Sequence, residues 1–266
     1  MTSTALDAPA WAPSTTLRSG AGYWFTGYRT MLRWHLSSLR MWLLLLVMLQ
    51  IVVGVGYVLG FALFFHPIPP MAALWVSTGT PVLNLILLGM LLGPQLVADV
   101  KQQGGYDFLR ALPVPRTASA AAWYTVTLIG GIPGMVITLV VAQARYHPGF
   151  TISSMVVPAT LLIVLTGTMI GYALAHAITN PMTTKLVTQA LVFISMGFAP
   201  ILFPAQQMPT WLADVNQWLP LGPMATIMRS VLTNGLVTDV GRAYLVVSVW
   251  GVVAGWLAVR ALGKQQ

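Results

Sequence analysis

The sequence predicts an all-α membrane protein with six transmembrane helices. Of its 266 residues, 57% are hydrophobic and only 7% are charged, whereas a typical soluble domain has about 25% charged residues. Long stretches without Asp, Glu, Lys or Arg recur along the chain. A bilayer core requires about 20 consecutive apolar residues per helix. A helix also satisfies its own backbone hydrogen bonds in lipid, so each charge-free stretch is interpreted as helical spans.

These stretches divide the chain into six spans. The first stretch covers residues 41–98, which is too long for one helix, and His66, Pro67, Pro69 and Pro70 interrupt its middle. It therefore predicts two spans joined by a short turn. The predicted spans are residues 41–65, 71–98, 117–144, 150–176, 186–203 and 243–259.

Basic residues predict the orientation of the spans, because cytoplasmic loops carry an excess of Lys and Arg. With the N-terminus inside, the cytoplasmic side holds Arg18, Arg29, Arg33, Arg40, Lys101, Arg110, Arg116, Lys185, Arg260 and Lys264. The opposite side holds only Arg145, Arg229 and Arg242. We therefore expect a multi-pass protein of the cell membrane, inner or plasma, with both termini in the cytoplasm.

The segment before the first span is amphipathic. Trp24 and Tyr28 lie on one side of the predicted helix, and Arg29 and Arg33 lie on another. Such a helix would lie along the lipid headgroups with its arginines toward phosphate, either as a simple anchor or as a docking element for a partner. The chain divides into a disordered tail, this interfacial helix and a six-span domain, residues 1–22, 23–40 and 41–266.

Several classes of chemistry are disfavoured. Ion-coupled carriers usually hold ionisable groups at membrane depth, but the predicted spans contain no Asp, Glu, Lys or Arg. The histidines fall near predicted membrane boundaries without metal-binding spacing, so we expect no metal site and no catalytic cluster; they are His35, His66, His147 and His176. The formal charge of +8 is attributed to loops facing an anionic membrane surface rather than to nucleic-acid binding.

The chain also lacks a source of energy. No G-x-x-x-x-G-K-[ST] phosphate loop occurs in the sequence, so the protein is not expected to hydrolyse ATP or to bind a cofactor itself. The one sizeable cytoplasmic connection, residues 99–116, contains a short predicted helix that Pro113 and Pro115 end. This helix would present Phe108 and Leu109 as an apolar patch, which suits either a partner's groove or an ordinary surface loop.

Two runs of residues resemble a known family. The first consists of Gly105, Tyr106, Asp107, Phe108, Leu109, Arg110, Pro113 and Arg116. It resembles the loop of type 2 ABC exporter permeases that forms the coupling helix touching the ATPase. The second contains Pro209, Trp211, Leu212, Pro220 and Arg229. It is similar to the family's segment before the last span, which forms short re-entrant helices on the external side.

The resemblance implies the membrane subunit of an ATP-driven exporter, with residues 41–266 as its permease domain. ATP and Mg would bind a separate cytoplasmic ABC ATPase, and a second copy of the chain or a similar permease would complete the translocation path near the second and fifth spans. The uncharged spans suit a lipophilic or amphipathic substrate, such as a drug or lipid, leaving the cytoplasm or inner leaflet. The alternatives are a non-transporting scaffold or assembly factor and an ion-coupled carrier.

Overall fold

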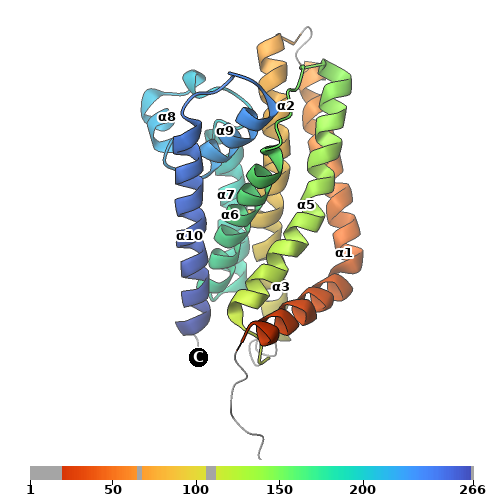
Figure 1. Cartoon of the computed structure of the whole chain (residues 1–266), viewed down its shortest axis with the longest axis vertical. Helices are drawn as coiled ribbons and strands as arrows, with labels where there is room; N and C mark the ends of the chain where they lie inside the picture. Colours follow the sequence, from red (N-terminus) through yellow and green to blue (C-terminus); the bar gives the residue numbers. More distant parts are fainter. Residues whose placement is uncertain (1–19, 65–67, 106–111, 265–266) are drawn as a thin grey trace, which may run out of the picture.

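The computed structural model describes residues 20–64, 68–105 and 112–264, and the elements in these residues are all helices. They are α1 (Ala21–Phe64), α2 (Pro70–Ile86), η1 (Leu87–Leu92), α3 (Gly93–Gln102), α5 (Arg116–Tyr146), α6 (Val156–Ala177), α7 (Pro181–Phe198), η2 (Ala205–Gln207), α8 (Thr210–Asn216), α9 (Leu221–Leu232) and α10 (Val240–Lys264). The long helices run side by side along the long axis of the molecule (Figure 1). The described ends of the chain, at the start of α1 and the end of α10, lie at the same end of this bundle.

Five of the helices in the described ranges are long and apolar enough to cross a membrane. They are α1, the continuous run of α2, η1 and α3, then α5, α6 and α10. Charge-free runs of this length bury their backbone polar groups within the helix and expose apolar side chains to lipid. The chain is therefore a multi-pass helical membrane protein.

Helix α1 joins two predicted segments into one element of 44 residues. The predicted interfacial helix and the first span are continuous, because the sequence between them contains neither proline nor glycine that would end the helix. Figure 1 shows the helix bending, so that its N-terminal part lies across one end of the bundle. Beyond the bend, one face is buried at every fourth residue, namely Leu46, Gln50, Gly54, Val58 and Ala62.

The second span contains a local change of helical winding. Between α2 and α3, residues 87–92 form a π-helix, in which each hydrogen bond closes a turn one residue longer than in an α-helix. At this point the backbone passes close to α6. A Cβ atom on Gly171 would clash with the carbonyl oxygen of Gly89, so only glycine permits this crossing.

Helix α7 lies in the region of the predicted fifth span but begins earlier than residue 186. The side chain of Asn180 accepts hydrogen bonds from the backbone N–H groups of Met182 and Thr183, at 2.8 and 3.3 Å, and Pro181 occupies the first turn. Asparagine at the N-cap followed by proline is a strong helix start. The helix is not among the five candidate spans, because Lys185 and several polar residues lower its hydropathy. A sixth span there stays a prediction.

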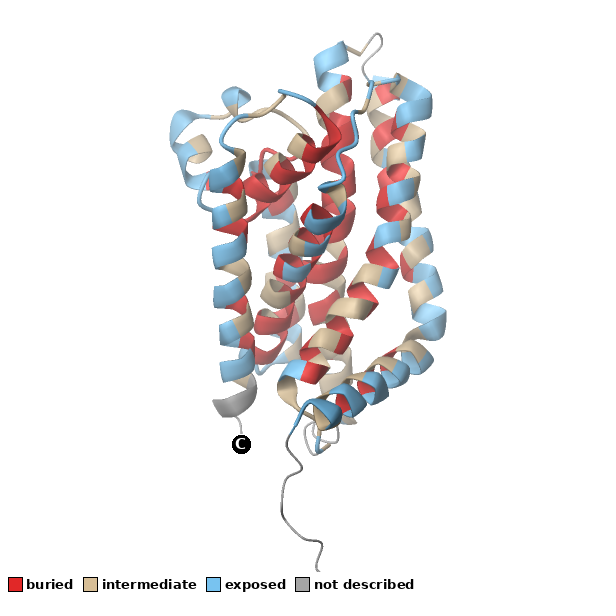
Figure 2. Ribbon diagram, viewed as in Figure 1, coloured by how far each residue is buried: buried red, intermediate tan, exposed pale blue. Residues whose placement is uncertain are grey.

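Three short elements, η2, α8 and α9, lie between α7 and α10 at the end of the bundle opposite the start of α1 (Figure 1). Helix α9 is buried along most of its length (Figure 2) and packs against α2, α6 and α10. Met224, Ile227 and Met228 are fully buried there, in the main hydrophobic cluster of the molecule. At this end of the bundle, α9 is therefore part of the packed core.

Candidate functional site

The connection between α3 and α5 is held at both of its described ends. Helix α3 ends at Gln102, and Gly104 follows it with a φ of +74°, in the left-handed region that favours glycine. After residues 106–111, which lie outside the described residues, the chain continues to Pro115 at the N-cap of α5. The hydroxyl of Tyr23 donates a hydrogen bond to the carbonyl oxygen of Pro113. The start of α1 therefore fixes the position of this connection.

The N-terminal part of α1 packs on the first turns of α5. The indole N–H of Trp24 donates to the hydroxyl of Thr117 at 2.9 Å, and the hydroxyls of Tyr28 and Thr125 are hydrogen-bonded at 2.9 Å. The rings of Trp24 and Tyr28 stack with centroids 5.7 Å apart. These two aromatic side chains were expected to face the headgroups. In the structure, each also forms a hydrogen bond with α5. A further aromatic residue, Phe25, is 60% exposed.

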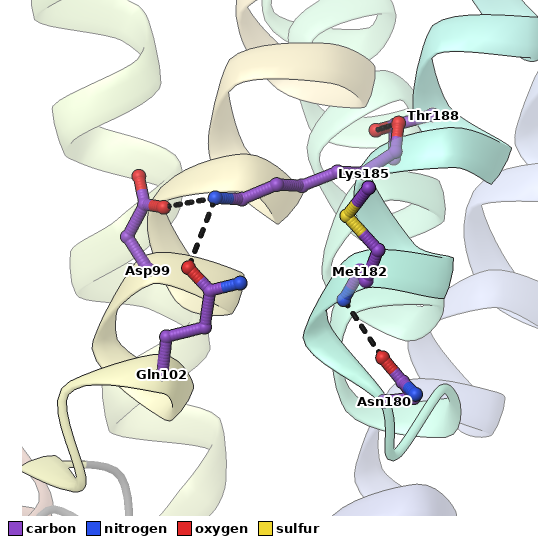
Figure 3. A network of polar contacts seen from close by, with 6 residues as sticks. All are labelled: Asp99, Gln102, Asn180, Met182, Lys185 and Thr188. Atoms are coloured by element: carbon purple, nitrogen blue, oxygen red, sulfur yellow. Dashed lines mark hydrogen bonds and ion pairs between the residues drawn. The ribbon is translucent and has the colours of Figure 1, made fainter.

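The last turn of α3 is bound to two neighbouring helices, α7 and α6, and Figure 3 shows the contact with α7. On one side, the Lys185 ammonium of α7 forms an ion pair with Asp99 at 2.6 Å and donates to the amide oxygen of Gln102 at 3.2 Å. On the other side, the Lys101 ammonium donates to the carbonyl oxygens of Ala175 and Ile178 at the end of α6, at 2.6 and 2.8 Å. A cation at a helix C-terminus is favourable, since the last carbonyl groups have no helical partner. We call Asp99, Lys101, Gln102 and Lys185 the α3 clamp.

A cavity of about 460 Å³ lies beside the clamp, between α1, α3, α5 and α6. Its lining includes the aromatic rings of Trp34, His35 and Trp123 beside several aliphatic side chains. The ring of His35 meets that of Trp123 edge to face, with centroids 4.9 Å apart. The carboxylate of Asp99 and the guanidinium of Arg116 line the same cavity. The connection therefore lies beside a space that has both aromatic and charged walls.

Arg229 organises the opposite end of the bundle. Its side chain is 1% exposed, and its guanidinium donates to the backbone carbonyl oxygens of Pro200, at 3.2 Å, and Ile201. The guanidinium also lies over the indole ring of Trp75, 3.8 Å from the ring centroid. Burial lowers the pKa of Arg229 to about 9, which leaves the group cationic at neutral pH. One side chain thus joins α9, the segment after α7 and the start of α2.

A polar cluster joins three helices in the interior of the bundle. The Gln50 amide of α1 donates to the backbone carbonyl oxygen of Asn84 at 2.5 Å. The Asn84 amide of α2 donates to the hydroxyl of Thr138 in α5 at 2.9 Å. All three side chains are buried. Glycine makes room for this cluster, because a Cβ atom on Gly54 would clash with the Thr138 hydroxyl oxygen.

Beside this cluster, an apolar groove of about 400 Å³ opens between α1, η1 and α7. Its lining residues include Leu49, Val53, Leu87 and Leu91. The hydroxyl of Tyr57, which lines the groove, donates a hydrogen bond to the sulfur of Met196 in α7, at 3.5 Å.

The described part of the chain holds no group of three or more His, Asp or Glu side chains that would bind a metal ion.

In a comparison with known protein families, residues 76–260 match the family model of ABC-2 family transporter proteins. The matched range covers more than half of the chain and includes most of the second span, the connection, the short helices and most of α10. The chain belongs to the ABC-2 transporter family. No curated protein is similar enough to count as a relative of this permease.

Membership agrees with the family resemblance derived from the sequence and makes the chain a type 2 ABC permease. Chains of this family are membrane subunits that associate with an ABC ATPase and oligomerise. Three of the predicted connection residues lie in the part of the chain that the structure describes, namely Gly105, Pro113 and Arg116. The others, Tyr106, Asp107, Phe108, Leu109 and Arg110, lie outside it, so a coupling helix there stays a prediction.

The other predicted site residues lie on α1 and in the segment between α7 and α10. Arg29 and Arg33 are exposed on α1, away from the face that packs on α5. Trp211 of α8 is exposed and Pro220 is buried, and only Arg229 has a network of contacts that binds neighbouring segments. The remaining two, Pro209 and Leu212, lie at the start of α8.

Sequence reasoning missed the partners of several permease residues. Lys185 appeared only among the cytoplasmic basic residues and Asp99 only as the first residue of the connection, although opposite charges flanking two predicted spans were a usable signal. Trp75 was not selected, because one tryptophan near a membrane boundary usually indicates an interfacial position. Its contact with Arg229 depends on how α2 and α9 pack.

Proposed function

We propose that this permease is the membrane subunit of an ATP-driven exporter. The match over residues 76–260 carries this proposal, and the held position of the α3–α5 connection supports it. In the proposed mechanism, a cytoplasmic ABC ATPase binds residues 106–111, with ATP and Mg on the ATPase chain. The ATPase changes the transporter's conformation only if it binds two conformations with different affinity.

The proposed orientation places this connection and both termini in the cytoplasm. The excess of basic residues on that side supports the orientation. Helix α7 would be the sixth span, and α8 and α9 would be re-entrant helices on the external side. The burial of α9 against α2, α6 and α10 is compatible with this arrangement.

The proposed substrate is lipophilic or amphipathic, such as a drug or lipid leaving the inner leaflet. The apolar groove between α1, η1 and α7 supports this class, because aliphatic side chains line most of it. A second copy of the chain, or a similar permease, would face this groove and complete the path. A Cβ atom added to Gly56 or Gly60 of α1 would have no atom of the described residues within 4 Å, so this face has room for a close helix contact.

The test is purification of the full-length chain from its native membrane, followed by reconstitution in lipid vesicles. We expect an ABC ATPase to co-purify and a fluorescent amphiphile to move across the vesicle membrane only with MgATP. The matched control is the same complex with hydrolysis blocked by vanadate.

The alternatives give different results in this experiment. A chain that purifies without any ATPase and moves no amphiphile would be a scaffold or assembly factor. Movement that continues without ATP but stops when the proton gradient is removed would identify an ion-coupled carrier. Either result contradicts the proposed function.

A further inference from the structure

The α3 clamp lies between the connection and α7. Asp99 and Gln102 are three residues apart, so they project from the same face of α3, and both contact Lys185 in the first turns of α7 (Figure 3). Residues 106–111 follow α3 after Gln103, Gly104 and Gly105. The clamp therefore lies a few residues along the chain from the place where the ATPase is proposed to bind.

Helix α7 has few other attachments. It packs mainly against α3 and η1, and its buried residues are only Thr184, Thr188 and Ser195. Many of its apolar side chains face outward, with Phe193 66% exposed. The ion pair to Asp99 is thus one of the few directional contacts that fix the position of α7.

The ion pair is suited to transmission rather than to stability. The side chains of Lys185 and Asp99 are 34% and 44% exposed, and pairs with this exposure contribute little to folding. The pair nevertheless gives α3 and α7 a specific contact between opposite charges at this point. Lys101 holds the same turn of α3 to the end of α6, so α3 has a fixed contact on its other side.

We propose that Asp99 and Lys185 are positioning residues that carry a displacement of the α3–α5 connection to α7, the helix that borders the apolar groove. This inference rests on the proposed function, since it requires an ATPase acting on the connection. In it, ATP binding moves the end of α3, and the ion pair moves α7 with it. The groove beside α7 then changes shape although no nucleotide binds this chain.

The experiment uses a fluorophore on α7. The natural chain has no cysteine, so Gln189→Cys, at an exposed position of α7, gives a single site for a bimane label. The emission of the labelled full-length complex with its ATPase is recorded without nucleotide and with MgATP and vanadate. We expect the emission to change when the nucleotide is trapped, because the surroundings of α7 change.

Four variants in the labelled background test the ion pair. Asp99→Asn removes one charge, and the emission change should fall about two- to fivefold while the ATPase stays bound and active. Lys185→Met should behave in the same way. The double variant Asp99→Lys with Lys185→Asp restores an ion pair and should recover most of the change. Asp214→Asn, an exposed carboxylate on α8, is the matched control and should resemble the parent.

The outcomes separate this inference from the proposed function. Failure of any ATPase to bind the parent chain contradicts the proposed function itself. With the ATPase bound and active, an unchanged parent emission shows that α7 does not respond, which overturns the inference. An emission change in Asp99→Asn as large as in the parent overturns it as well, and so does a double variant that recovers nothing.

Discussion

The guanidinium of Arg229 lies over the indole of Trp75, with its central carbon 3.8 Å from the ring centroid. The same guanidinium donates to carbonyl oxygens of the segment that follows α7. A desolvated cation–π contact contributes about 2 kcal/mol, and a hydrogen bond to a charged group about 1.5–3 kcal/mol. This side chain therefore holds the short helices to the bundle.

Replacing Arg229 should destabilise the permease strongly. We expect Arg229→Met to lower the free energy of unfolding by about 2–4 kcal/mol, because it leaves buried carbonyl groups without donors and removes the cation–π contact. The measurement is unfolding of the purified chain in detergent, followed by circular dichroism. The control is Arg242→Met, whose exposed guanidinium lies 4.5 Å from the Trp218 ring centroid and should cost about 1 kcal/mol or less. Equal losses in both variants would contradict the anchoring role.

The crossing of η1 and α6 should not tolerate a side chain at Gly171. Gly171→Ala places a Cβ atom against the Gly89 carbonyl oxygen, so the helices must separate, at a cost of about 1–3 kcal/mol. Gly197→Ala in α7 is the control, since nothing in the described residues lies near its Cβ position, and it should be neutral or stabilising by up to about 1 kcal/mol. Thermal unfolding of the two variants in the same detergent measures the difference. A Gly171→Ala chain as stable as Gly197→Ala would show that the helices do not cross this closely.

The hydrogen bond between Asn84 and Thr138 should contribute only modestly, despite its burial. Polar contacts between membrane helices average about 0.6 kcal/mol in double-mutant cycles, because the unfolded chain in lipid also finds polar partners. We therefore expect a cycle of Asn84→Ala and Thr138→Val to give a coupling energy near that value. Ser195, which donates to the Leu191 carbonyl oxygen of its own helix, should show no coupling to either residue. A coupling energy of zero between Asn84 and Thr138 would exclude the bond.

The ATPase should bind through the connection rather than through the rest of the cytoplasmic surface. We expect Phe108→Ala and Leu109→Asp, chosen from the sequence pattern, to weaken ATPase association and to leave membrane insertion unchanged. Co-purification of the ATPase with each variant measures the effect. Arg260→Ala is the control, because this exposed residue lies on α10, away from the connection and from the interfacial helix. Full association in both connection variants would place the docking site elsewhere.

Orientation is open to a direct measurement, because the natural chain lacks cysteine. A cysteine replacing the exposed Gln103 should react with an impermeant maleimide only after cells are opened. A cysteine replacing the exposed Gln217, after α8, should react in intact cells. The reverse pattern would place the connection outside, where no cytoplasmic ATPase reaches it.

Much of the helical layout was predictable because the bilayer imposes it. A charge-free run must span lipid as a helix, so the five candidate spans fall within or around predicted ranges. The start of α7 was also readable, since Asn180 and Pro181 form a helix-start signal. The predicted fifth span begins only at residue 186 because it was drawn from the charge-free run after Lys185. The continuity of α1 was likewise available, from the lack of a helix-breaking residue between its two parts.

For the candidate site, the sequence indicated some of the residues but not their contacts. Arg229 was selected from its resemblance to a family pattern, but its contact with Trp75 depends on the packing of α9 against α2. Lys185 was used only as a cytoplasmic basic residue and Asp99 only as the start of the connection, and nothing local in the sequence states that α3 and α7 meet. Such pairs depend on the rotation and crossing of helices that are distant along the chain.

The sequence by itself determined that this protein lies in a membrane, roughly where its helices cross and which family it resembles, because hydropathy, charge and short motifs are local properties. Only the tertiary structure decided which polar groups meet: Lys185 with Asp99, Gln50 with the Asn84 carbonyl, and Arg229 with Trp75. The physical reason is that lipid gives apolar side chains almost no preference among helix faces, so close backbone contacts at glycine and a few buried polar groups fix how the helices pack.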